Sequence, residues 1–151
     1  FNISNYLCIC ILLISVNLFS KDFPAKFDIK YELIHAKKNV GEILTVIDIL
    51  LHPATLEGFA NVAMQALAAA KPVVSSAVGG MPEIVLDGET GILVPPQNPA
   101  AIVDALDKLL SDSSLRDKLG RKGQQRVKEK FSVEYMVANT LAVYEKILAE
   151  N

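Results

Sequence analysis

Two side chains that bind hydroxyl groups frame a predicted helix start. Glu57 directly precedes Gly58, and Gln65 lies two helical turns further along the chain. Carboxylates and side-chain amides both hydrogen-bond hydroxyls, so the pair suits the hydroxyls of a sugar and a ribose. Gly58 carries no side chain and allows a ligand to approach the backbone closely.

The start of this helix is also suited to a diphosphate. The first-turn amides, at about residues 59–62, have no partner within the helix, and the helix dipole adds positive potential. Together these features predict a site for a diphosphate ester with hydroxyl recognition. A simpler interpretation stays open, and spacing alone favours it: Glu57 only stabilises the positive end of its helix.

The site needs a strand that ends just before the loop carrying Glu57. Ile49–His52 is a short apolar run stopped by Pro53, which is typical of a buried strand. Ligands of open parallel sheets bind where such strands end and helices begin. The expected elements of this part are a helix over 40–47 with Asn39 as N-cap, a strand over 49–52, a helix over 59–70, a strand over 72–75, a short helix ending at Val85 and a strand over 92–94.

Three amphipathic segments close the chain. Asn98 and Pro99 are a helix N-cap and first helical residue, a second helix starts near Ser113, and a third follows Ser132. Alternating strands and helices predict an α/β fold: a Rossmann-like parallel sheet flanked by helices, with the terminal helices packed across it.

Several sequence blocks resemble one known family. The segment 57–74 looks like the signature of glycosyltransferase family 4 (glycosyl transferases group 1), the retaining enzymes with the GT-B fold, and 78–85, 87–96 and 131–132 match it in order. The resemblance starts near Asn39 and implies the C-terminal, donor-binding half of a GT-B fold, truncated at its N-terminus. Residues 39–151 are then an incomplete nucleotide-sugar-binding domain, and 1–38 form an unassigned apolar segment and connection.

The resemblance implies roles for individual residues. Glu57 is the implied catalytic residue, which contacts hydroxyls of the donor sugar. Where the family has a second Glu that holds the ribose, this chain has Gln65, at a loss of about 1–2 kcal/mol in donor binding. Glu83 is interpreted as a helix-start charge, with a substrate contact as the alternative. The implied donor-binding residues are Gly58, Phe59, Ala60, Asn61, Val62, Gln65, Gly79 and Gly80, the last two keeping the donor space open.

The implied reaction transfers a sugar from a nucleoside diphosphate to an acceptor hydroxyl, with retained anomeric configuration and no metal or cofactor. The family's basic Arg and Lys pair has no match here, and the acceptor-binding N-terminal domain is missing, so the chain alone is not expected to be active. Two alternatives stay open. One is a truncated or degenerate fragment that binds nucleotide weakly or not at all, and the other is a nucleotide-sugar epimerase on the same fold.

Composition limits the partners and the location. A formal net charge of −2 argues against nucleic acid. The uncharged front, apolar over 6–19, suits a buried strand, a membrane or signal segment, or a sequence artefact. Cys8 and Cys10 fit buried free thiols rather than a metal site. A cytoplasmic location is expected.

Two further groups have open interpretations. His52 lies at a strand end beside the site, where a structural role is favoured over proton transfer, and nothing positions His35. The segment 114–130 carries seven basic residues against two acidic ones. It is a solvated helix face or, alternatively, a peripheral contact with an anionic membrane.

Overall fold

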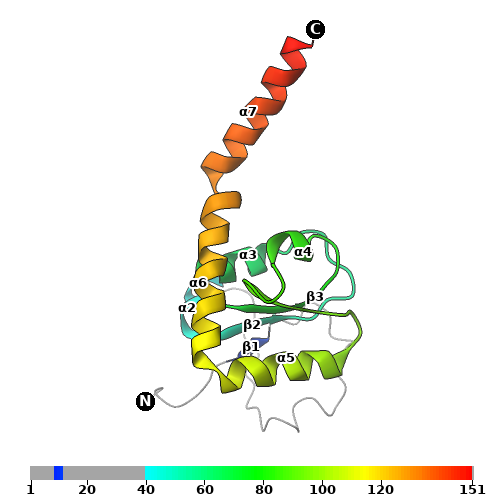
Figure 1. Ribbon diagram of the computed structural model, residues 1–151, viewed down its shortest axis with the longest axis vertical. Helices are drawn as coiled ribbons and strands as arrows, with labels where there is room; N and C mark the ends of the chain where they lie inside the picture. Colours follow the sequence, from blue (N-terminus) through cyan, green and yellow to red (C-terminus); the bar gives the residue numbers. More distant parts are fainter. Residues whose placement is uncertain (1–8, 12–39, 151) are drawn as a thin grey trace.

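The computed structural model describes residues 9–11 and 40–150, and its core is one parallel sheet between helices (Figure 1). The sheet has the order β1-β2-β3-β4, and each neighbouring pair is parallel. The predicted α/β fold with a parallel sheet is therefore confirmed. The strands are β1 (Ile9–Ile11), β2 (Ile49–His52), β3 (Val73–Ser76) and β4 (Gly91–Val94), and the helices are α2 (Val40–Val46), α3 (Asn61–Ala68), α4 (Met81–Ile84), α5 (Pro99–Ser111), α6 (Ser113–Lys130) and α7 (Val133–Ala149).

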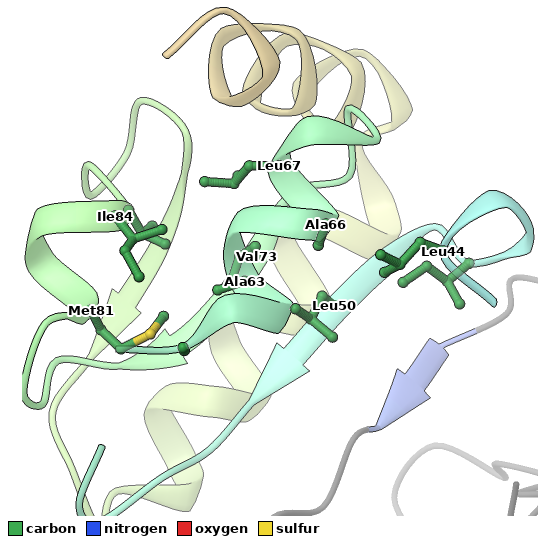
Figure 2. Packing of buried hydrophobic residues seen from close by; sticks show 11 residues of the cluster. Leu44, Leu50, Ala63, Ala66, Leu67, Val73, Met81 and Ile84 are labelled. Carbon is green, nitrogen blue, oxygen red and sulfur yellow. The ribbon is translucent and has the colours of Figure 1, made fainter. Parts of the chain in front are cut away.

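Helices cover both faces of the sheet, and successive residues of each strand point to opposite faces. The buried side chains therefore form two clusters, one on each face. On one face, Leu50 and Val73 pack against α2, α3 and α4. Figure 2 shows this cluster gathered around the strands, with Ala63, Ala66 and Leu67 contributed by α3. The small alanines let α3 lie close to the sheet and so fix the position of the helix start.

The opposite face is covered by α5 and the beginning of α6. Ile49, Leu51 and Val74 pack there against the apolar side of α5, which includes Leu106 and Leu109. The amphipathic character predicted for this helix is therefore confirmed: its buried residues are Ile102, Ala105, Leu106 and Leu109.

The helix starts near the C-terminus follow their capping residues. Asn98 Oδ1 accepts from the Ala101 amide at 3.1 Å, and Pro99 is the first residue of α5, as predicted. Ser132 caps α7 in the same way, through the Tyr135 amide at 3.1 Å. The predicted start of α6 at Ser113 is also confirmed, with Asp112 as its cap.

Two expectations differ from the structure. The helix predicted over 59–70 is shorter, Asn61–Ala68, because residues 59 and 60 form a turn in which the Asn61 amide donates to Phe59 O. The prediction that all terminal helices pack across the sheet was wrong for α7. No residue of α7 is buried, and the helix extends away from the body (Figure 1). Helical spacing of apolar residues predicts an apolar stripe, but not which surface covers it.

The apolar front contains a strand at Ile9–Ile11, which pairs with β2 in the register Ile9 with Ile49. The predictions for Cys8, His35 and Asn39 concern the segments 1–8 and 12–39, which lie outside the described residues. Among the helices that the structure describes, none is long and apolar enough to span a membrane.

Candidate donor-binding site

The candidate site lies at the C-terminal edge of the sheet, where two loops meet. One loop leads from β2 to α3 and carries Glu57 and Gly58, and the other leads from β3 to α4 and carries Gly79 and Gly80. Because the strands are parallel, both loops leave the same edge. The Gly80 amide donates to Gly58 O at 2.9 Å and joins the two loops directly.

Both carboxylate oxygens of Glu57 have a partner. Oε2 lies 3.0 Å from His52 Nε2, and Oε1 accepts from the Gly58 amide at 3.0 Å. The Glu57 side chain keeps 18% of its surface exposed, whereas that of His52 keeps 1%. An ionised carboxylate has about four acceptor positions, so about two remain for hydroxyl groups of a ligand.

The start of α3 offers fewer free amides than the sequence predicts. The Gly58 amide is occupied by Glu57 Oε1, and the Asn61 amide by Phe59 O. Within residues 9–11 and 40–150, the amides of Phe59, Ala60 and Val62 have no acceptor. These three donors, two just before α3 and one in its first turn, still provide the positive potential that attracts a phosphate group.

The glycines of the two loops have different surroundings. A Cβ on Gly58 would meet no atom within 4 Å, so open space lies beside Gly58 itself. A Cβ on Gly79 would lie 1.7 Å from Glu57 O, and one on Gly80 2.7 Å from Gly58 O. Backbone therefore fills the positions where the side chains of Gly79 and Gly80 would start, which requires glycine at both. That the two glycines also keep ligand space open stays a prediction.

Gln65 and Asn61 lie one helical turn apart on the exposed side of α3. The Gln65 backbone oxygen accepts from the Ala69 amide, within the ordinary bonding at the end of α3. Gln65 is exposed in the second half of α3, and its contact with a ribose stays a prediction. Glu83 lies in the first turn of α4, the position that its interpretation as a helix-start charge requires.

Arg126 supports the site from α6, a role that the sequence did not reveal. Its guanidinium donates to Glu83 O at 2.6 Å and to Ile84 O at 3.1 Å, at the end of α4. It also lies 5.6 Å from the ring centre of Phe131, which packs on Phe59 at 6.2 Å. These contacts tie the end of α6 to α4 and to the loop before α3, although the residues are distant in sequence.

The basic segment 114–130 is not uniformly exposed. Arg116 donates to Leu109 O and Leu110 O at the end of α5, and Arg126 is half-buried. The other five basic residues of α6 are exposed. Inward contacts of the two arginines reduce the charge available to an anionic surface.

Comparison with known proteins establishes the family. Residues 29–126 match the model described as Glycosyl transferases group 1. The chain belongs to this family. This group 1 chain is 32% identical over 130 residues to Uncharacterized glycosyltransferase MJ1178 of Methanocaldococcus jannaschii, covering 84% of this chain and 37% of that protein. It is 35% identical over 104 residues to Capsular polysaccharide biosynthesis glycosyltransferase CapM of Staphylococcus aureus, covering 69% and 27%.

Solved glycosyltransferases share the fold of this group 1 chain. Sucrose-phosphate synthase from Thermosynechococcus elongatus matches with a TM-score of 0.66 and 33% identity, over 72% of this chain and 27% of that one. The C-terminal domain of the group 1 protein LpcC from Francisella tularensis matches with a TM-score of 0.61 and 33% identity, over 68% and 53%. Anabaena HepE in complex with UDP-glucose matches at 0.63 with 23% identity, over 69% and 30%, which shows the fold alone.

The group 1 chain spans only part of its relatives. It covers 37%, 27% and 30% of the length of three curated proteins that it matches. The matched region is therefore well under half the length of each of these relatives.

Proposed function

We propose that this chain forms the nucleotide-sugar-binding part of a retaining glycosyltransferase, which transfers a hexosyl group from a nucleoside diphosphate to an acceptor hydroxyl. The observation that carries the proposal is the arrangement of the Glu57 carboxylate beside the free amides of Phe59, Ala60 and Val62. A Cβ on Gly58 would meet no atom within 4 Å, so a ligand can approach the backbone closely at this position, between Glu57 and Phe59.

Each group has a defined task in this proposal. Hydroxyls of the donor sugar donate to the remaining acceptor positions of Glu57. The amides at the start of α3 donate to the diphosphate and stabilise the negative charge that grows as it leaves. Gln65 contacts the ribose. The acceptor and its binding domain belong to other parts of the protein, which the partial coverage of the relatives supports.

The proposed site is tested by titrating the chain with UDP-glucose and with UDP while amide resonances are recorded by NMR. UDP-glucose is a suitable probe because HepE, which shares the fold, was solved with it. We expect the resonances of Phe59, Ala60 and Val62 to move most, and to do so equally with EDTA present. In the described residues no three His, Cys, Asp or Glu side chains gather into a metal-binding group. Loss of binding in EDTA would contradict a metal-free site.

The same titration separates the alternatives. If neither probe binds, the chain is a fragment without nucleotide affinity. Conversion of the donor with no acceptor present, followed by NMR of the sugar, would instead identify an epimerase. Sugar transfer by the complete protein, with the anomeric configuration of the product read from its coupling constants, would support retention.

The substitution Gln65→Glu is expected to tighten UDP-glucose binding about tenfold, because a carboxylate makes a charge-assisted hydrogen bond to a ribose hydroxyl, a gain of about 1–2 kcal/mol. Calorimetric titration of both chains measures the change. Gln97→Glu adds the same charge at an exposed turn before α5 and is the control. An unchanged dissociation constant for Gln65→Glu would remove Gln65 from the ribose site.

A further inference from the structure

His52 is held rigidly at the end of β2. It is the last residue of that strand, and it pairs in register with Ser75 of β3. Ser75 Oγ donates to the His52 backbone oxygen at 2.8 Å, and only 1% of His52 is exposed. The imidazole therefore has a fixed position on the sheet, whereas its partner Glu57 lies in the loop that follows.

The contact between His52 and Glu57 determines which nitrogen of the imidazole carries the proton. A carboxylate only accepts hydrogen bonds, so Nε2 carries the proton that points to Glu57 Oε2 at 3.0 Å. The other nitrogen, Nδ1, is buried without a partner among the described residues. A buried polar atom without a partner destabilises a fold, which argues that the ring is not simply a filler of the core.

Proton transfer by His52 does not fit this geometry. A general base must come within hydrogen-bonding distance of the substrate, directly or through one water. The ring is buried, its Nε2 is used by Glu57, and Nδ1 points into the protein interior. Any effect of His52 on a ligand therefore passes through Glu57.

We propose that His52 is the positioning residue of Glu57. It fixes the Glu57 carboxylate so that Oε1 accepts the hydrogen bond from the Gly58 amide and the free acceptor positions face the donor sugar. This inference rests on the proposed function for its consequence, but the positioning itself does not require a ligand. Without the imidazole, the Glu57 side chain on its loop would sample several rotamers. Both the bond to Gly58 and the contact to sugar hydroxyls would then weaken.

Two variants separate positioning from simple packing. His52→Leu removes the donor and keeps an apolar side chain, whereas His52→Gln keeps an amide nitrogen about as far along the side chain as Nε2. Thermal unfolding of both shows whether the fold is retained. The Gly58 amide is the reporter, because its proton resonance shifts when the accepting carboxylate of Glu57 becomes ionised.

We expect the pH-dependent shift of the Gly58 amide proton to fall by half or more in His52→Leu and to be largely kept in His52→Gln. An undiminished shift in His52→Leu would overturn the proposal, whether or not any nucleotide binds. If His52→Leu does not fold, the comparison uses His52→Gln and Glu57→Gln instead. A pH-dependent shift of the Gly58 amide proton in His52→Gln that is as small as in Glu57→Gln would also overturn the proposal.

The consequence for the donor is measured with UDP and UDP-glucose on the same chains. We expect His52→Leu to remove the affinity gained from the glucose group while leaving the dissociation constant of UDP unchanged within twofold. Equal weakening of both probes would show a general support of the loop and overturn the proposal. If the unsubstituted chain binds neither probe, the proposed function fails, and the Gly58 shift alone decides the role of His52.

Discussion

Under the proposed function, replacing Glu57 with glutamine in the complete protein is expected to lower kcat/KM for sugar transfer about 100-fold. Glutamine replaces a charge-assisted acceptor with a neutral one, a loss of about 2–3 kcal/mol where the sugar is bound. It also cannot satisfy both present partners, because its NH₂ group would face either the Gly58 amide or His52 Nε2–H. Steady-state kinetics with varied donor measures the loss.

The folded state is expected to change much less in this variant. One weakened contact at a partly exposed side chain costs about 1 kcal/mol of unfolding free energy. Glu42→Gln, an exposed carboxylate on α2, is the matched control and is expected to leave transfer unchanged. If Glu57→Gln turns over as fast as Glu42→Gln, Glu57 does not belong to the site.

Gly79→Ala is expected to lower the free energy of unfolding by about 3 kcal/mol or more. Gly79 has a φ of 53°, where a side chain is strained by about 1 kcal/mol. The new Cβ would in addition lie 1.7 Å from Glu57 O, so the two loops must separate. Urea unfolding of the 151-residue chain measures the change.

Gly88→Ala is the matched control for this effect. Gly88 also has a positive φ, of 69°, but its Cβ would meet nothing within 4 Å. Backbone strain alone then predicts a cost of about 1 kcal/mol. Equal costs for the two variants would show that the loops are not in the close contact described here. A larger cost at Gly79 would support backbone packing as the reason for its glycine.

The sequence by itself determined the type and order of the elements and the candidate residues. A continuous apolar run ended by Pro53 predicted β2, which is buried along its whole length. Helical spacing of apolar residues predicted the amphipathic helix α5. Capping residues such as Asn98 and Ser132 marked helix starts because their bonds to the first turn are local. The resemblance around Glu57 indicated the family because each matching block is a short stretch of consecutive residues, which can be recognised without the fold.

Only the tertiary structure decided how these residues meet. The burial of His52 and its contact with Glu57 depend on how the loop folds back onto the sheet, which residue types do not specify. The role of Gly79 depends on a backbone twenty-two residues away, and that of Arg126 on carbonyls of α4. The exposure of α7 was missed because a helical pattern records which residues are apolar, whereas packing partners follow from long-range contacts.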